Sequence, residues 1–218
     1  MYYDALAEST LGQILLRVSE TGLAGLYFVG QKDCPQLPGL PEPSVQARDP
    51  RAGLRNGKPI RSIRVAPKAV EMDLLYFDDN DSLVLQKGLR LLNHDTPIAA
   101  LSILEQTQTE LSQYFQKQRQ VFSLPLDLSQ GTPFQQSIWT ALTHIPFGDS
   151  WSYGQLAKFA GFDSGYGRAA GAAVGANPVT IIVPCHRVVA ANRQLNGYSG
   201  GLNRKFALLQ HEGLVQAT

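Results

Sequence analysis

The sequence predicts an α+β protein with two parts. The first is a mixed N-terminal domain with a small β-sheet and a helix, and the second is a mostly helical C-terminal domain with a winged helix-turn-helix. Short runs of alternating apolar and polar residues, separated by turn residues, fill the first thirty positions. Helix-capping signals and helical spacing dominate after residue 131. We therefore expect an α/β domain over residues 1–130 and a second domain over residues 131–218.

Two strands are predicted near the start of the chain. Apolar and polar residues alternate over 13–18 and 23–29, and Glu20-Thr21-Gly22 between them has the composition of a turn. The stretch from 34 to 67 holds more than half of the thirteen prolines and shows no sustained period. It therefore predicts a Pro-rich, loop-like insertion.

Regular elements are predicted again after this insertion. Apolar residues on both sides of Asp78-Asp79-Asn80-Asp81 predict a hairpin over about 72–85. Residues 97–118 carry apolar side chains at helical spacing, and Val121–Leu128 predicts a further strand. Ser129-Gln130-Gly131 then marks the expected boundary between the domains.

The second half opens with two helix-start signals. Thr132-Pro133-Phe134-Gln135 and Ser152-Tyr153-Gly154-Gln155 both match the capping box, and the second predicts a short helix that ends at Gly161. A Gly/Ala-rich helix follows from Arg168 and ends at Asn177-Pro178. Two short helices joined by a tight turn predict a helix-turn-helix.

Three further elements are predicted after that motif. The β-branched run Val179–Val183 predicts a buried strand, and Asn196-Gly197 predicts the hairpin of a β-wing. Asn203 is expected to cap a final helix that stops before Gly213.

Composition limits the classes of protein to be considered. The chain has 218 residues, of which 44% are hydrophobic and 17% charged, so a packed core is expected. No apolar run approaches the roughly 18 residues of a membrane span, and the first residues do not have the pattern of a signal peptide. We expect a cytoplasmic protein without a membrane partner.

Cysteine and histidine usage points away from metal binding. Cys34 and Cys185 are the only cysteines, so one disulfide is possible by number, but reduced thiols inside a cell are the simpler interpretation. These residues and the four histidines show no zinc-ligand spacing, and we expect no metal.

The net charge of +1 hides an asymmetry between the two halves. From Gly131 onward six basic residues stand against three acidic ones, giving +3, whereas the remainder of the chain carries −2. A modest positive bias suits contact with a polyanion. An ordinary solvated surface can have the same composition, so the charge alone decides nothing.

The Gly/Ala-rich helix has an unusual composition for the second helix of a helix-turn-helix. Nearly every side chain after Arg168 is Gly or Ala, so this helix offers no long polar side chains for reading base edges in the major groove. Its backbone could approach something bulky closely. Small residues equally permit tight packing against another helix, and the spacing does not separate the two explanations.

Pro184-Cys185-His186-Arg187 is the sharpest chemical signal. It directly follows the predicted buried strand, so a rigid element would fix its position. A thiol with the reference pKa of about 8.5 is mostly protonated at neutral pH, and a nearby base or cation raises its thiolate fraction. His186 could take the proton and Arg187 adds positive charge, although a buried structural cysteine would fit the residues alone equally well.

Motifs throughout the second half occur together in one family. They are Gly131-Thr132-Pro133-Phe134-Gln135, Ser152-Tyr153-Gly154-Gln155-Leu156-Ala157, Gly171 with Gly175-Ala176-Asn177-Pro178, Pro184-Cys185-His186-Arg187-Val188-Val189, Asn196-Gly197-Tyr198-Ser199-Gly200-Gly201-Leu202 and Lys205-Phe206-Ala207-Leu208-Leu209-Gln210-His211-Glu212-Gly213. In order and spacing they closely resemble the O6-alkylguanine-DNA alkyltransferases over residues 131–214. Residues 1–130 match only in general pattern, and Phe162–Gly167 is longer and richer in glycine than the family pattern.

The resemblance implies direct repair of DNA. Cys185 would accept the alkyl group of O6-alkylguanine irreversibly, after the base is flipped out of the duplex through the minor groove. His186 would deprotonate the thiol through a bound water, and Glu212 would orient that histidine. Asn177 would hold the active-site segment, and Tyr153 would donate a hydrogen bond or proton to the departing guanine.

The resemblance also implies how DNA is bound. Arg168, beside Ala169 on the DNA-contacting helix, would enter the duplex and fill the space of the flipped base. The base-pocket roles fall to Tyr198 and Val174 as lining, to Ser199 at the exocyclic oxygen, and to the backbones of Cys185 and Val188 at the guanine amino group. Duplex DNA with alkylated guanine is the expected partner of a monomer, and no cofactor is expected because the lesion itself is the alkyl donor.

Three rival hypotheses are kept. A lesion-binding module of the alkyltransferase-like kind would lack the acceptor cysteine, which this chain has at Cys185. A transcriptional regulator would carry polar base-reading side chains on the second helix. A cysteine hydrolase using Cys185 and His186 would turn over an ester or an amide.

Overall fold

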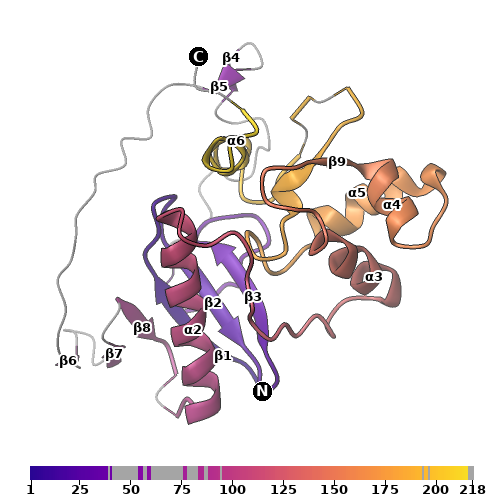
Figure 1. Cartoon of the computed structure of the whole chain (residues 1–218). Helices are drawn as coiled ribbons and strands as arrows, with labels where there is room; N and C mark the ends of the chain where they lie inside the picture. Colours follow the sequence, from indigo (N-terminus) through magenta and orange to yellow (C-terminus); the bar gives the residue numbers. More distant parts are fainter. Residues whose placement is uncertain are drawn as a thin grey trace. The chain divides into compact units, whose positions relative to one another are not determined.

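The structure is a computed structural model of the chain (Figure 1). It describes residues 1–38, 40, 54–55, 58–59, 76–77, 83–85, 88–93, 95–192, 194–195 and 197–215. The described residues form two compact units, one from within Met1–Val29 and Ser62–Asp127, the other from within Gly30–Arg61 and Leu128–Thr218. The first contains a sheet and a helix and the second is mostly helical, so the predicted α+β class is confirmed. The boundary expected at residues 130 and 131 stays a prediction, and most of the 34–67 insertion lies outside the described residues.

A six-stranded antiparallel sheet forms the first unit, in the order β3-β2-β1-β8-β7-β6. Its strands are β1 Tyr3–Ala7, β2 Ile14–Val18, β3 Leu23–Phe28, β6 Tyr76–Phe77, β7 Leu83–Leu85 and β8 Leu89–Leu91. The two predicted strands (β2 and β3) and the predicted hairpin (β6 and β7) are confirmed. Strand β1 was missed because it contains Asp4, a poor strand former, whose carboxylate lies 2.7 Å from Arg17 on β2.

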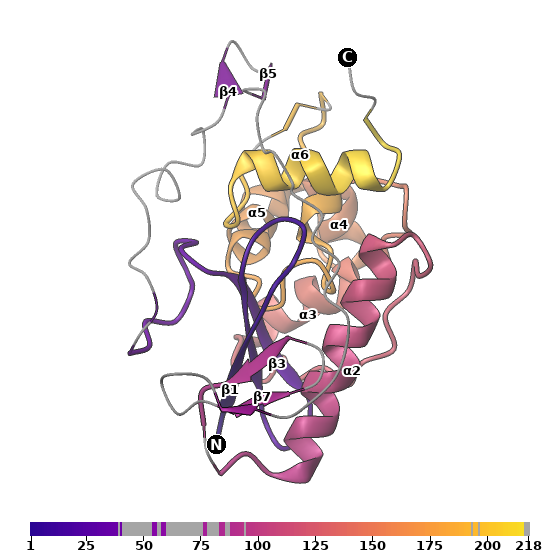
Figure 2. The same ribbon diagram turned by 90° about the vertical axis from the view of Figure 1, so that its left-hand side faces the viewer.

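Helix α2, Ile98–Phe115, lies along one face of strands β1–β3 (Figure 2). Its buried residues include Leu104, Leu111 and Tyr114, which confirms the predicted amphipathic helix. The strand predicted over Val121–Leu128 is wrong. Only Leu126 forms a bridge, with Leu23, and Pro125 beside it has no N–H with which to extend a ladder.

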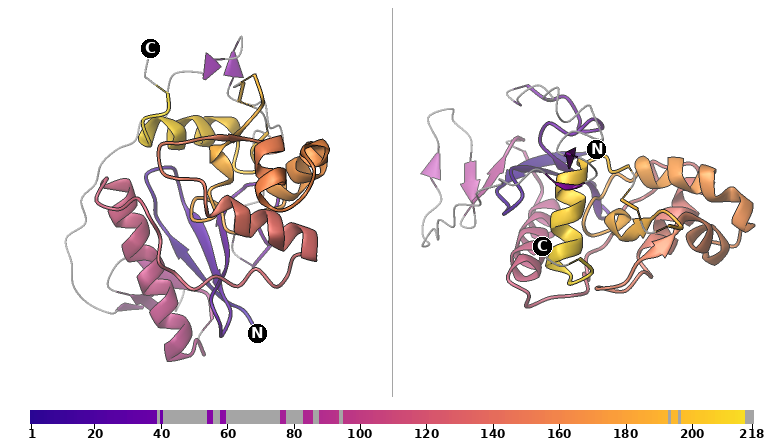
Figure 3. Two further views of the ribbon diagram at one scale, coloured as in Figure 1. Left: turned by 45° about the vertical axis from the view of Figure 1, so that its right-hand side comes forward. Right: turned by 90° about the horizontal axis from the view of Figure 1, so that it is seen from above.

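The second unit contains α3 Pro133–Leu142, α4 Tyr153–Phe159, α5 Gly167–Gly175 and α6 Leu202–His211. Both predicted capping boxes are present. The side chains of Thr132 and Ser152 each accept from the N–H three residues on, and their backbone N–H groups each donate to the side chain of the glutamine at that position. Helices α3, α4 and α5 pack together (Figure 3). None of the helices in the described ranges is long and apolar enough to cross a membrane.

Shorter elements complete the second unit. They are the 3-10 turns η1 Ser164–Tyr166 and η2 Cys185–Arg187, and the strand pairs β4 Leu54–Arg55 with β5 Lys58–Pro59 and β9 Trp151–Ser152 with β10 Val188–Val189. The hairpin expected at Asn196-Gly197 depends on Asn196, which lies outside the described residues.

Of three further predictions in this unit, two are wrong and one is confirmed. Asn203 does not cap the final helix, because Gly201 at φ 91° is its N-cap residue and Asn203 already lies in the first turn. Gly213 follows the helix at φ 83°, as predicted for a left-handed C-terminal glycine. The run Val179–Val183 is buried but forms a turn rather than a strand, and Ile181 has a positive φ of 71°.

Candidate active site

A buried turn before Cys185 is held by the side chain of Asn177. Its Nδ2 donates to the carbonyl of Val183 at 2.8 Å, and its Oδ1 accepts from the N–H of Val179 at 3.1 Å. A positive φ is costly for a β-branched residue, so Ile181 keeps it only because surrounding contacts impose it. Asn177 thereby fixes the backbone that leads into Cys185.

Cys185 begins the 3-10 turn η2, and strand β10 follows immediately. The backbone N–H of Cys185 donates to Val183 O at 2.8 Å. Strand β10 then pairs in parallel with β9, with Val189 opposite Ser152. Because Tyr153 follows Ser152 and opens α4, this short ladder ties the start of α4 to the cysteine turn.

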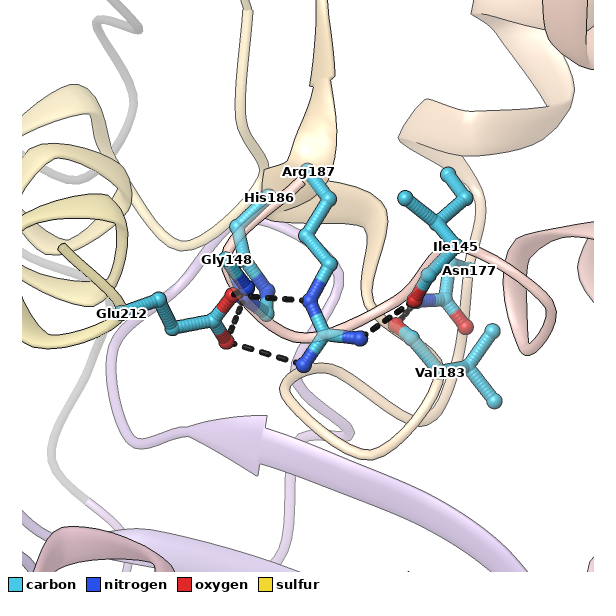
Figure 4. Close-up of polar contacts among 7 residues, drawn as sticks. All are labelled: Ile145, Gly148, Asn177, Val183, His186, Arg187 and Glu212. Atoms are coloured by element: carbon cyan, nitrogen blue, oxygen red, sulfur yellow. Dashed lines mark hydrogen bonds and ion pairs between the residues drawn. The ribbon is translucent and has the colours of Figure 1, made fainter. Parts of the chain in front are cut away.

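Glu212, at the end of α6, is the centre of a buried polar network (Figure 4). Its Oε1 lies 2.8 Å from His186 Nε2, and Arg187 donates to both carboxylate oxygens at 2.9 Å. Arg187 also donates to Ile145 O at 2.6 Å, and the N–H of Gly148 reaches Glu212 at 3.4 Å. The carboxylate is therefore compensated from several sides, as a buried charge requires.

The resting Cys185 is a protonated thiol. Its residue is 2% exposed. Burial raises the thiol pKa to about 11, although a hydrogen bond from Asn177, the charge of Lys205 and the backbone N–H groups of Cys185 and His186 each lower it. Desolvation therefore outweighs the effect of the neighbouring cation, and the thiol keeps its proton in the resting state.

His186 is placed to accept a proton. Burial lowers its pKa, against the opposing effect of Glu212, so the imidazole is neutral at neutral pH. Burial alone would raise the pKa of Glu212, but hydrogen bonds from His186 and Arg187 bring it to about 2. When Nε2–H donates to this carboxylate, Nδ1 is the acceptor, and Nδ1 is buried with no hydrogen-bond partner among the described residues.

Lys205 is a buried cation near Cys185 that the sequence-based reasoning did not place at the site. It is completely buried on α6, and its ammonium group donates to Val188 O at 2.6 Å. Burial lowers its pKa to about 8, and its charge lowers the pKa of Cys185. A signal was available, because Lys205 lies at helical spacing from Leu202, Leu208 and Leu209, on the apolar face of the final helix.

Arg187 has a different role from the one predicted. Its guanidinium is bound to Glu212, and Lys205 is the cation that acts on the thiol. Arg187 instead holds the carboxylate that holds His186.

The remaining predicted residues divide into a buried and an exposed group. Tyr153 lies against Gly171 of α5, and burial, followed by the nearby Cys185, raises its pKa so that it keeps its proton. Among the expected pocket residues, Val174, Val188 and Tyr198 are buried, and the buried hydroxyl of Ser199 has no hydrogen-bond partner in the part of the chain that the structure describes. The expected DNA-contacting residues Arg168 and Ala169 are exposed.

Small residues lie on both the packed side and the exposed side of helix α5. Gly171 lies against the ring of Tyr153, and the carbonyl of Ala173 accepts a hydrogen bond of 2.8 Å from Trp139 Nε1 of α3. These contacts bear out the packing explanation for one side of the helix. Ala169 and Ala172 remain exposed, so the other side stays open to a close partner.

Within the described ranges, no three His, Cys, Asp or Glu side chains gather as metal ligands would, and Cys34 and Cys185 form no disulfide. The expectation of a metal-free site stays a prediction.

Comparison with known proteins defines the class of this site. Residues 133–214 match the profile described as 6-O-methylguanine DNA methyltransferase, DNA binding domain. The methylated-DNA–protein-cysteine methyltransferase of Mycobacterium tuberculosis is 42% identical over 142 residues, which span 57% of this chain and 85% of that relative. The Salmonella typhimurium protein of the same name is 49% identical over 106 residues, 49% of this chain and 61% of that relative.

A solved structure extends the likeness to both parts of the chain. The crystal structure of Mycobacterium tuberculosis OGT in complex with DNA matches with a TM-score of 0.61 and 29% identity, over 95% of this chain and 90% of that one. The chain belongs to the methylated-DNA–protein-cysteine methyltransferase family. The resemblance inferred from its motifs is thus confirmed.

We expect Asn177→Ala to destabilise the fold. It leaves the buried Val179 N–H unsatisfied, at about 1–3 kcal/mol, and removes one of the two hydrogen bonds to the Val183 carbonyl, at about 1 kcal/mol. The free energy of unfolding, measured by urea denaturation, should fall by roughly 2–4 kcal/mol. Asn192→Ala is the matched control, because Asn192 makes one exposed bond to Gln194 N and should cost less than about 1 kcal/mol. Equal costs for the two variants would show that Asn177 does not hold the turn.

We expect Lys205→Met to change two pH-dependent properties. Between pH 7 and 9 the unfolded wild type keeps a proton on Lys205 that the folded wild type loses near pH 8. Wild-type stability should therefore rise with pH relative to the variant, by up to about 1.4 kcal/mol per pH unit in urea melts. Methyl transfer should also slow, because the thiolate loses a nearby cation. Lys117→Met, an exposed charge-matched control, should change neither, and identical stability profiles for wild type and Lys205→Met would contradict the coupling.

Proposed function

We propose that this chain repairs DNA by moving the alkyl group of O6-alkylguanine onto the sulfur of Cys185, once per molecule. One observation carries the proposal: in a chain of this family, a buried thiol adjoins a neutral His186 whose Nδ1 has no partner and whose Nε2 is fixed by Glu212. An unsatisfied buried acceptor is costly in a purely structural site. Such an unsatisfied acceptor is expected where a water must bind and a proton must pass during a reaction.

The electrostatics support a relay that acts only during the reaction. With its pKa raised to about 11, the thiol needs a base to become a nucleophile. His186 takes the proton through a water on Nδ1, and the Glu212 carboxylate stabilises the imidazolium that forms. Lys205 stabilises the thiolate while it exists.

The transfer step requires no cofactor. The thiolate attacks the saturated carbon on O6, a carbon–sulfur bond forms as the carbon–oxygen bond breaks, and the electron pair passes to the guanine. Tyr153, which keeps its proton, hydrogen bonds to the purine or protonates it as this charge develops. The thioether product is neutral and has no route back to a thiol, so one monomer acts once.

Access to Cys185 requires base flipping. The residue is 2% exposed and the alkylated oxygen lies within the base stack, so the guanine must leave the duplex to meet the sulfur. The exposed small residues of α5 allow close approach to a minor groove, and the exposed Arg168 can replace the extruded base.

Base recognition falls to groups around the cysteine turn. The unpartnered Ser199 hydroxyl suits the exocyclic oxygen, and the buried Tyr198 and Val174 offer apolar surface to the purine. A carbonyl has two lone pairs, so Val188 O can hold Lys205 and still accept from the guanine amino group, with the Cys185 backbone beside it.

We expect mass spectrometry to find one added methyl group, on Cys185, after incubation with a duplex containing O6-methylguanine. The DNA should contain restored guanine in equal amount. Cys185→Ser should still bind the duplex and transfer nothing, whereas Cys34→Ser should react like the wild type. A bound duplex without an adduct would leave a lesion-binding protein, and catalytic release of product from an ester would favour the hydrolase.

We expect Arg168→Ala to slow repair of duplex DNA at least tenfold more than reaction with free O6-benzylguanine. The free base needs no extrusion, so it should not depend on a side chain that fills the stack. The measurement is the single-turnover rate with each substrate. Equal losses on both would rule out the finger role.

A further inference from the structure

The turn between α4 and α5 carries an exposed aromatic residue. After Gly161 at φ 87°, the chain folds into the 3-10 turn η1, which ends at Tyr166 directly before α5. Among the described residues of the second unit, the exposed large apolar side chains are Tyr166, 50% exposed, and Phe159, 53% exposed. Tyr166 occupies the N-cap position of α5 but makes no side-chain capping bond, so capping does not explain its presence.

Tyr166 is held in place before any ligand binds. Its ring centroid lies 5.7 Å from that of Phe162 and 6.3 Å from that of Phe134, and the latter two rings pack edge to face at 4.7 Å. Phe134 belongs to α3, so the three rings fasten the turn to a neighbouring helix. This packing explains the half-buried Phe134 and Phe162 but leaves half of Tyr166 uncovered. A ring fixed in advance loses little conformational entropy on binding.

The surface around Tyr166 has few long side chains. Over residues 164–176, which are all described, the exposed positions carry Ser, Gly or Ala except at Tyr166 and Arg168. A duplex that approaches α5 closely enough for Arg168 to enter it therefore meets one other large side chain, two residues earlier.

We propose that Tyr166, in the turn before α5, is a DNA-contacting residue that packs its exposed ring on a sugar and base next to the gap left by the extruded guanine. The inference rests on the proposed function. Ring stacking on nucleotides is sequence-tolerant, as a protein that must find a lesion in any sequence requires. Tyr166 supplies duplex affinity, while Arg168 fills the stack.

The test measures the single-turnover rate of methyl transfer against the concentration of a duplex containing O6-methylguanine, which separates affinity from the rate at saturation. Tyr166→Ser should weaken the apparent affinity roughly tenfold and leave the saturated rate within about twofold of the wild type. Tyr166→Phe keeps the ring and should match the wild type. Phe159→Ser, which removes an equally exposed ring packed on Trp151, should also match it.

Four results would overturn the inference. The first two are wild-type affinity in Tyr166→Ser and a saturated rate that falls together with the affinity in that variant. The third is an equal loss of affinity in Tyr166→Phe, which would indicate a hydroxyl contact. The fourth is an equal loss of affinity in Phe159→Ser, which would indicate a general surface effect. Thermal melting of each variant checks the fold, and the slope of affinity against salt should not change in Tyr166→Ser, because a ring releases no counterion. Absence of transfer by the wild type would refute the proposed function instead.

Discussion

The carboxylate of Glu212 is the group on which the rest of the site depends. It is a buried charge at the end of the last helix, and it is acceptable only because Arg187 binds both its oxygens and His186 adds a third contact. Arg187 in turn reaches the carbonyl of Ile145, so a loop, a helix end and the cysteine turn share one network. The bond to Glu212 sets the tautomer of His186: Nε2 carries the hydrogen and Nδ1 can accept a proton.

Burial has opposite effects on the groups beside this carboxylate. It keeps the Cys185 thiol protonated, which protects it from casual reaction, and it keeps His186 neutral, which preserves a base. Burying a lysine is costly, yet the lowered pKa of Lys205 leaves an ammonium group beside the thiol at neutral pH. The neutral imidazole of His186 and the ammonium group of Lys205 therefore lie beside a protonated sulfur. In the proposed reaction, both act when the thiol proton is transferred.

The sequence was most informative where structure is determined locally. The capping boxes at Thr132 and Ser152 located two helix starts, because their bonds join residues three apart. The cysteine motif is local in the same sense, because Cys185, His186 and Arg187 are consecutive in the chain. The run Val179–Val183 misled, because β-branched residues favour a strand only when a partner strand is present, and here the Asn177 side chain supplies the bonds instead. Nothing local to residues 179–183 encodes the positive φ of Ile181.

Lys205 shows where sequence-based reasoning stops for the site. Its position on an apolar helix face is readable, but Cys185, the thiol whose pKa its charge lowers, lies twenty residues away in the chain. The turn η2 directs the backbone N–H groups of Cys185 and His186 to the sulfur, and Val188 O, directly after it, accepts from the ammonium group. The charge balance follows from that geometry. When the thiol proton leaves, the new anion faces an ammonium group and backbone donors that are already in place, so little reorganisation is needed at the moment of reaction. In the proposed reaction a neutral thioether replaces the thiol, so the same ammonium group would then face a sulfur that can no longer ionise, and the relay would have no second proton to move.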